Sequence, residues 1–153
     1  MGWCGLAEQY RYIVRIAGVD IPGDMKLVHG LSLIKGVGYN FALALCRLIG
    51  IDPEKRVGFL TDAEVEKIES AIRDPLSVGI PAWMLNRRKD YETGRDLHLI
   101  GADLIYYVKR DIEREKKIRS WRGIRHALGL KVRGQRTATT GRIGMTVGVK
   151  RRK

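Results

Sequence analysis

The stretch from Ser120 to Lys153 constrains the fold more than any other feature, because it contains ten Lys or Arg residues and no Asp or Glu. The preceding 119 residues contain nineteen basic and seventeen acidic residues, so most of the net charge of +12 lies in this stretch. From Gly129 onward it has five glycines, four threonines and no aromatic residue, and it cannot bury enough apolar surface to offset chain entropy. We therefore expect a folded N-terminal part followed by a segment that is disordered alone and binds a polyanion.

The overall composition excludes several classes of protein. A chain of 153 residues with 44% hydrophobic content can form one domain with a modest core. Its longest apolar run, residues 41–46, is far shorter than the roughly 20 residues that span a bilayer. The N-terminus matches neither a signal sequence nor a myristoylation pattern. We expect a cytosolic protein that binds nucleic acid and has no membrane partner.

The cysteines and histidines form no metal-binding or catalytic pattern. Cys4 and Cys46 are the only cysteines, and no His stands at ligand spacing from them. The sequence therefore predicts no metal and no cofactor, and the lack of a clustered nucleophile and base predicts no enzyme activity. His29 and His98 are interpreted as surface or packed residues, whereas His126 lies within the basic run and is a candidate for an RNA contact.

The first half of the chain predicts a short strand followed by helices. In residues 10–22 the side chains alternate between two sides, as in a strand or extended arm. We expect the segment Asp20 to Pro22 to form the turn that ends it. Residues 26–51 show two helical patterns that flank a glycine hinge, residues 35–38, and Gly50 ends the second one. Thr61 and Glu64 form a capping box that starts a third helix with a solvated acidic outer face, which Asp74-Pro75 ends.

The glycine hinge has two interpretations. Gly36 and Gly38 would let the backbone turn and let a phosphate approach the free N–H groups of the second helix, where Lys35 adds a cation. Alternatively, the hinge serves only packing. These four residues support both interpretations equally, and the basic C-terminal stretch favours the phosphate site.

The second half of the chain predicts a linker, a long helix and a tail. Residues 80–100 are interpreted as a linker and exposed β-hairpin, in which the run 86–89 could contact a nucleic-acid backbone. One helix is expected from Ala102 to about Ser120, with Glu115 paired to Arg119 on its surface. A short basic helix over residues 122–130 and a glycine-punctuated tail follow.

Several ordered runs of residues carry a resemblance to a known family. The runs RGIRHALGL (122–130), VRGQRT (132–137) and TVGVKRRK (146–153), with RIAGVDIP (15–22), resemble the small-subunit ribosomal protein thirteen family. Residues 80–104 resemble its archaeal and eukaryotic branch, which includes eukaryotic small-subunit protein eighteen. The resemblance extends from about Tyr12 to Lys153.

The residues and the resemblance together predict a mainly α architecture. The expected parts are a helix-two-turns-helix domain over residues 12–79 and a linker with an exposed β-hairpin over residues 80–100. A long helix plus a short basic helix over residues 101–130 and an extended basic tail over residues 131–153 follow.

The resemblance implies a structural constituent of the small ribosomal subunit rather than an enzyme. It implies binding to ribosomal RNA in the subunit head, with small-subunit ribosomal protein nineteen and a bridge protein of the large subunit as partners. Its C-terminal tail would contact transfer RNA. Candidate ribosomal RNA contacts are Lys35, Gly36, Gly38, Arg87, Arg88, Lys89, Arg122, Arg125, His126, Lys131, Arg133 and Arg136. Candidate transfer RNA contacts are Arg142, Lys150, Arg151, Arg152 and Lys153.

Two other function classes compete with this interpretation. DNA glycosylases also use a helix-two-turns-helix module, but they resemble one another in an N-terminal proline nucleophile and usually a C-terminal four-cysteine zinc finger. This chain begins Met1-Gly2 and has no cysteine after Cys46, so it departs from that pattern. A free-standing, nonspecific nucleic-acid binder would have the same charge, and co-sedimentation with ribosomes would distinguish it.

Overall fold

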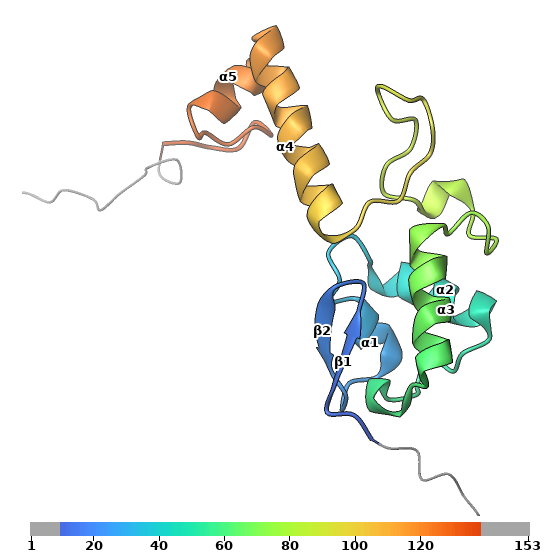
Figure 1. Ribbon diagram of the computed structural model, residues 1–153. Helices are drawn as coiled ribbons and strands as arrows, with labels where there is room; N and C mark the ends of the chain where they lie inside the picture. The colour runs from blue at the N-terminus through green and yellow to red at the C-terminus, as the bar shows by residue number, and fades with distance from the viewer. Residues whose placement is uncertain (1–9, 139–153) are drawn as a thin grey trace, which may run out of the picture. The chain divides into compact units, whose positions relative to one another are not determined.

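The computed structural model describes residues 10–138, and it is mainly helical, as predicted (Figure 1). The chain divides into two compact units, an N-terminal unit that ends at Ile105 and a C-terminal unit that begins at Tyr106. The elements in chain order are β1 (Ile13–Ile16), β2 (Val19–Pro22), α1 (Leu27–Leu31), α2 (Tyr39–Ile49), the 3-10 turn η1 (Val57–Phe59), α3 (Asp62–Arg73), the 3-10 turn η2 (Ala82–Met84), α4 (Gly101–Ile118) and α5 (Trp121–Ala127).

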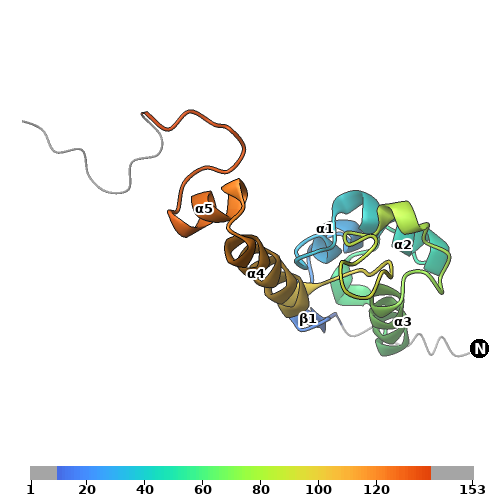
Figure 2. The ribbon, with the colours of Figure 1, turned by 90° about the horizontal axis from the view of Figure 1, so that it is seen from above.

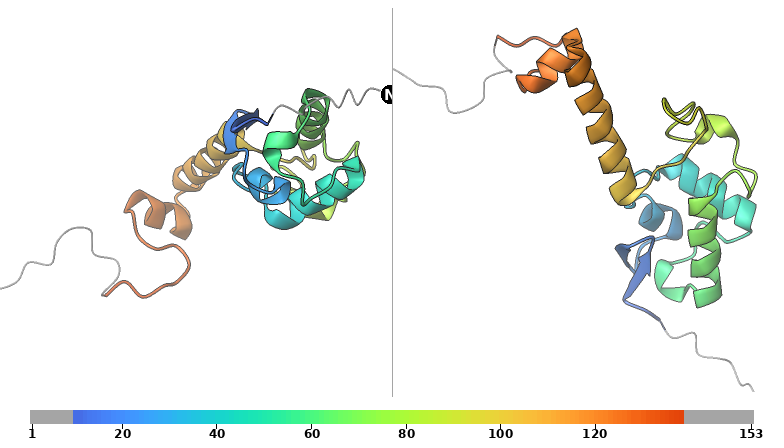
Figure 3. Two further views of the ribbon diagram at one scale, coloured as in Figure 1. Left: turned by 90° about the horizontal axis from the view of Figure 1, so that it is seen from below. Right: turned by 45° about the horizontal axis from the view of Figure 1, so that its top comes forward.

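The strands β1 and β2 form an antiparallel pair that lies against α1 and α3 (Figure 3). The predicted alternation is confirmed within β1, because Val14 and Ile16 are buried while Ile13 is exposed, but it does not extend to Tyr12, which is exposed. The predicted turn at Asp20 to Pro22 is wrong, since these residues belong to β2.

The chain reverses earlier, at Ala17 and Gly18, and both have positive φ angles. Ala17 adopts φ +48°, a left-handed conformation that is costly for a residue with a Cβ. Its backbone N–H donates to Glu69 Oε1 at 2.9 Å, so a contact from α3 holds the turn in place. The turn therefore depends on a residue far away in the sequence.

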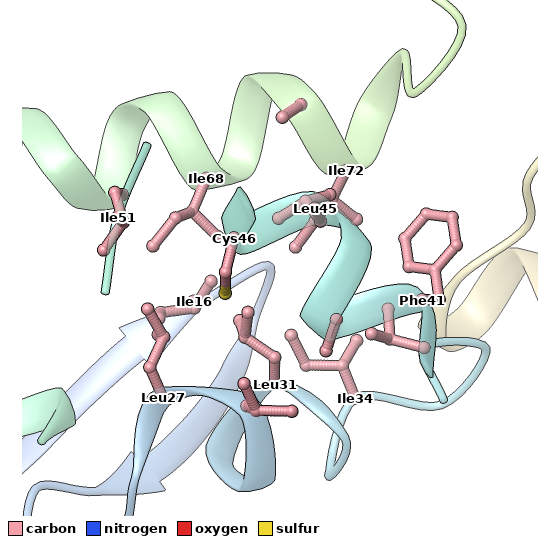
Figure 4. Packing of buried hydrophobic residues seen from close by; sticks show 14 of the residues in the cluster. Ile16, Leu27, Leu31, Ile34, Phe41, Leu45, Cys46, Ile51, Ile68 and Ile72 are labelled. Carbon is pink, nitrogen blue, oxygen red and sulfur yellow. The ribbon is translucent and has the colours of Figure 1, made fainter. Parts of the chain in front are cut away.

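The core of the N-terminal unit lies between the strand pair and the first three helices (Figure 4). Each buried aliphatic side chain contributes about 1.5–3 kcal/mol relative to exposure. The amphipathic pattern of the second predicted helix is confirmed for most of its length, because α2 buries Phe41, Ala42, Leu45 and Cys46 and ends at Gly50 with φ +78°, while Leu48 near its end is exposed. Burial raises the pKa of the Cys46 thiol to about 11. The largest fully buried side chains include Ile16, Leu27, Leu31, Ile34, Leu45, Ile68 and Ile72.

Helix α3 begins with the predicted capping box. Thr61 Oγ1 accepts from the Glu64 backbone N–H at 3.3 Å, and the Glu64 carboxylate accepts from the Thr61 N–H at 2.8 Å. The acidic face is less solvated than predicted, because Glu64 also accepts from Lys55 Nζ at 2.9 Å and Glu69 holds Ala17. These carboxylates therefore connect α3 to other parts of the N-terminal unit and stabilise it.

A loop replaces most of the hairpin predicted over residues 80–100. Only one antiparallel bridge forms within this described segment, between Arg87 and Leu97. Asp90 fixes the loop instead, because its carboxylate accepts from Arg87 Nε at 2.6 Å and from Thr93 Oγ1 at 3.0 Å. Side-chain contacts of Asp90, together with backbone bonds such as that from the Asp90 N–H to the Arg95 carbonyl at 2.9 Å, therefore hold this loop where strand pairing was expected.

In the C-terminal unit, α5 lies beside the last turns of α4 (Figure 2). Arg119 lies beyond the end of α4 with φ +56°, and among the salt bridges of the described residues none joins it to Glu115, so that predicted pair is wrong. Ser120 caps α5, since its Oγ accepts from the Gly123 N–H at 3.0 Å. A Cβ at Gly123 would lie 2.1 Å from the Glu115 carbonyl oxygen, so only glycine allows this close packing. Across residues 10–138, no helix is long and apolar enough to cross a membrane.

Candidate nucleic-acid interface

A basic surface covers the C-terminal unit after α4. Its residues are exposed or half-buried, and the described stretch 120–138 contains no acidic residue that could neutralise them. The surface includes all six predicted ribosomal RNA contacts of this region, and three of them, Arg122, His126 and Arg133, line one pocket. We define the basic surface as Arg122, Arg125, His126, Lys131, Arg133 and Arg136.

Three cations of the basic surface have no internal partner. Within the part of the chain that the structure describes, the side chains of Arg122, Lys131 and Arg133 form no salt bridge. Like charges held close together repel one another, and a polyanion relieves this repulsion while releasing its own counterions. The arrangement therefore favours binding to a nucleic-acid backbone.

In the N-terminal unit, several cations are neutralised internally, although others such as Arg47 and Arg56 form no salt bridge among the described residues. Arg11 pairs with Asp62 through two hydrogen bonds, at 2.6 and 3.0 Å. Lys55 pairs with Glu64 at 2.9 Å. Acidic partners of this kind are absent from the described stretch 120–138, so the cations there remain available to a polyanion.

Trp121 is an exposed aromatic residue at the start of α5 that the predicted contacts omit. Its side chain is 71% exposed, and the Arg125 guanidinium lies 5.6 Å from the centroid of its ring. Arg125 Nε also donates to the Lys131 carbonyl oxygen at 2.5 Å, which fixes the arginine over the ring. An aromatic ring beside cations can stack on a nucleobase, an interaction worth about 1–3 kcal/mol. In the sequence, only its position within a basic run indicated that Trp121 could contact a nucleic acid.

The pocket of the C-terminal unit has a volume of about 300 Å³. It lies between α4, α5 and the segment that follows α5. Both polar and apolar side chains line it, and they come from three consecutive parts of the chain that fold against one another. The lining includes Ile112, Glu115, Arg122, His126, Val132 and Arg133.

In the glycine hinge, the two glycines have different roles. Gly36 has φ +102°, and a Cβ there would lie 2.3 Å from the Leu99 carbonyl oxygen. The neighbouring Lys35 carbonyl accepts from the Gly101 N–H at 2.8 Å, so this side of the hinge packs against the start of α4. Gly38 precedes α2, is exposed, and has no atom within 4 Å of an added Cβ. The packing interpretation thus fits Gly36, while Gly38 is open to a ligand.

In the loop over residues 86–99, the three predicted cations also differ. The Arg87 side chain is 17% exposed and binds Asp90, and its hydrogen bond to the Asp90 carboxylate holds the pKa of that group at about 2. Arg88 and Lys89 are exposed. Lys89 has φ +48°, and its backbone N–H donates to Asp96 Oδ1 at 2.8 Å. Arg87 therefore stabilises a loop that presents Arg88 and Lys89 to solvent.

His98 is packed, as the sequence predicted. Its ring stacks on Phe41 with centroids 4.1 Å apart and an interplanar angle of 7°. Both ring nitrogens are buried without a hydrogen-bond partner among the described residues, and burial lowers the pKa of His98. His29 lies near the Tyr39 ring, with centroids 5.4 Å apart. His98 therefore serves packing, whereas His29 is an exposed residue of α1.

Some predicted residues lie outside the described ranges. Arg142 and the terminal run 150–153 belong to residues 139–153, which the structure does not describe, and Cys4 belongs to residues 1–9. Between residues 10 and 138, no three His, Cys, Asp or Glu side chains cluster closely enough to hold a metal ion.

Comparison with known proteins places the chain among ribosomal proteins. The family described as ribosomal protein S13/S18 matches residues 15–143. Small ribosomal subunit protein uS13 of Hyperthermus butylicus is 79% identical over 146 residues, covering 95% of this chain and 97% of the relative. The uS13 protein of Staphylothermus marinus is 67% identical over 147 residues, covering 96% and 97%, and that of Aeropyrum pernix is 63% identical over 144 residues, covering 94% and 96%. The chain therefore belongs to the ribosomal protein S13/S18 family, a structural and non-enzymatic component of the ribosome.

Proposed function

We propose that this protein binds small-subunit ribosomal RNA in the subunit head through its basic surface, and that the hinge and the loop over residues 86–99 add further contacts. Family membership makes the protein a structural constituent of the small ribosomal subunit, which binds RNA and acts in translation in the cytoplasm.

The unpaired cations of the basic surface carry this proposal. Arg122, Lys131 and Arg133 have no salt-bridge partner among the described residues, although they lie in a compact unit of a protein that contains seventeen acidic residues. Phosphate groups would neutralise them on binding, with release of counterions. Trp121 supports the same proposal, because its exposed ring could stack on a base next to those phosphates.

The hinge and the loop supply the second and third contacts. At the hinge, Lys35 is exposed next to the open N-terminus of α2, and no side chain caps that helix. Free N–H groups at a helix N-terminus and a nearby ammonium group favour a phosphate. In the loop, Arg88 and Lys89 are the candidate contacts. Gly36 and Arg87 act indirectly. Gly36 fixes the backbone next to Lys35, and Arg87 fixes the loop that carries Arg88 and Lys89.

The C-terminal tail is proposed to contact transfer RNA through Arg142 and the run 150–153. The resemblance to the family and the absence of acidic residues from this stretch of sequence support the proposal. Small-subunit ribosomal protein nineteen and a bridge protein of the large subunit are proposed as protein partners on the same resemblance.

The salt dependence of RNA binding tests the role of the basic surface. One triple variant replaces the unpaired cations by Gln, and a control triple variant replaces three exposed cations of the N-terminal unit, so both lose the same charge. Each phosphate contact adds roughly 0.7–0.9 to the slope of log affinity against log salt, so the first variant should lower that slope by about 2–3. The variants are Arg122→Gln with Lys131→Gln and Arg133→Gln, and Arg47→Gln with Arg56→Gln and Lys67→Gln.

Filter binding to the head domain of small-subunit ribosomal RNA measures both slopes, and circular dichroism verifies that the variants fold. The control should keep a slope close to that of the unchanged protein. Equal slopes in the two variants would show that total charge matters and that the basic surface does not, which would refute the proposal.

A further inference from the structure

The pocket of the C-terminal unit combines cations, a carboxylate and apolar walls in a way that phosphate binding alone does not require. We propose that this pocket binds a single unpaired guanine nucleotide of the ribosomal RNA. This inference rests on the proposed function, because it needs the basic surface to face RNA. It adds the class of nucleotide that the surface recognises.

The size and walls of the pocket suit a nucleobase. A volume of about 300 Å³ is at the lower end of the range for pockets that take small ligands. Ile112 from α4 and Val132 from the segment after α5 provide the apolar lining. A planar base can contact such aliphatic groups with its faces while its polar edges meet the rest of the lining.

Glu115 is the residue that distinguishes this pocket from a phosphate site. Its carboxylate would repel a phosphate, yet it lines a pocket in the most basic unit of the protein. Ser120 Oγ donates to this carboxylate, which restrains its orientation. The second acid of the pocket, Asp111, pairs with Arg114 at 3.3 Å. Glu115 therefore offers an oriented acceptor to a ligand that carries hydrogen-bond donors.

Among the four RNA bases, guanine fits an oriented carboxylate best. Its N1–H and N2 amino group are two adjacent donors, which match the two oxygens of a carboxylate. On the same edge, adenine and cytosine each place a ring-nitrogen acceptor next to their amino group, and uracil places carbonyl acceptors beside its single N–H. A carboxylate facing any of these three edges would meet at least one acceptor, and the two acceptors would repel each other.

The cations of the pocket favour the same base. Arg122, His126 and Arg133 line the pocket together with Glu115. An arginine can bind guanine O6 and N7 with two hydrogen bonds, the commonest base-specific arginine contact, and it can also bind the phosphate of the same nucleotide. The carboxylate and the guanidinium groups thus select one base for independent chemical reasons.

Chemical probing with kethoxal tests this inference, because kethoxal reacts with N1 and N2 of unpaired guanines. The full-length protein is bound to small-subunit ribosomal RNA, and guanine reactivity is compared between the unchanged protein and Glu115→Gln. The amide of Gln retains an acceptor for Ser120 and removes the charge. The matched control is Glu113→Gln, an exposed position on α4 outside the pocket lining that loses the same charge.

We expect one guanine that the unchanged protein protects to regain its reactivity, by several-fold, with Glu115→Gln but not with Glu113→Gln. A second variant, Val132→Phe, fills the pocket from a segment outside the helices and should remove the same protection. Circular dichroism verifies the fold of each variant.

Three results would overturn the inference, and they separate it from the proposed function. If the protein binds the RNA but no guanine depends on Glu115, the pocket does not read guanine. If dimethyl sulfate shows an adenine or cytosine protected in a Glu115-dependent way instead, the choice of base is wrong. If the unchanged protein does not bind the RNA at all, the proposed function fails and this inference fails with it.

Discussion

Replacement of Gly36 by Ala is the sharpest test of how the hinge is built. Gly36 has φ +102°, a conformation that residues with a Cβ rarely adopt. The added Cβ would lie 2.3 Å from the Leu99 carbonyl oxygen and 3.2 Å from the Ile100 Cα. Both neighbours are backbone atoms, so no side-chain rotation can relieve the overlap. The segment that precedes α4 would have to move away from the hinge.

Two separate costs determine the size of the effect. The left-handed backbone conformation costs a residue with a Cβ about 1–2 kcal/mol. Moving the segment away breaks the hydrogen bond from the Gly101 N–H to the Lys35 carbonyl, which contributes about 0.5–1.5 kcal/mol. We therefore expect Gly36→Ala to lower the free energy of unfolding by about 1.5–3.5 kcal/mol.

Gly38→Ala is the matched control, two residues further along the same hinge. Gly38 has an ordinary φ of −95°, and nothing lies within 4 Å of its added Cβ. Its main cost is the poorer N-cap, which we expect to stay below about 1 kcal/mol. Urea denaturation followed by circular dichroism measures both variants. Equal losses of stability would refute the conclusion that Gly36 is needed for packing while Gly38 has free space around it.

Two further predictions concern pH and the tail. Because burial lowers the pKa of His98, the folded state resists the proton that the unfolded state accepts, so stability should fall as pH drops below about 6.5. His98→Phe, which keeps a ring next to Phe41, should reduce this slope in urea denaturation at several pH values, and an unchanged slope would exclude His98 as its cause. Shortening the chain after Thr146 should weaken transfer RNA binding to small subunits at low salt without preventing assembly, because it removes four terminal cations. An affinity equal to that of intact subunits would rule out the tail contact.

Local sequence signals predicted the helices well. The capping box at Thr61 and the glycine at position 50 are formed within a few residues of chain, and both are present as expected. The turn between the strands could not be predicted in this way. Ala17 has no turn propensity of its own, and its left-handed conformation depends on Glu69 in another helix.

The candidate site shows the same limit. The basic character of the C-terminal stretch follows directly from composition, because charge needs no tertiary structure to be counted. The pocket is different, because Glu115 and Arg133 come together only after the reversal at Arg119 and the close packing at Gly123. Likewise, Arg87 looked equivalent to Arg88 in sequence, and only the buried Asp90 gives it a structural role.

The long-range contacts of the N-terminal unit also set an order of events during synthesis of the chain. The hydrogen bond from the Ala17 N–H to Glu69 cannot form until Glu69 has left the exit tunnel. The bond from the Gly101 N–H to the Lys35 carbonyl of the hinge must wait until Gly101 has followed. Domains generally fold as units, the N-terminal one first, as the chain emerges. Every partner needed for these contacts precedes Tyr106, where the C-terminal unit begins. The nascent chain can therefore complete its apolar core before its most cationic segment emerges among the polyanions of the cell.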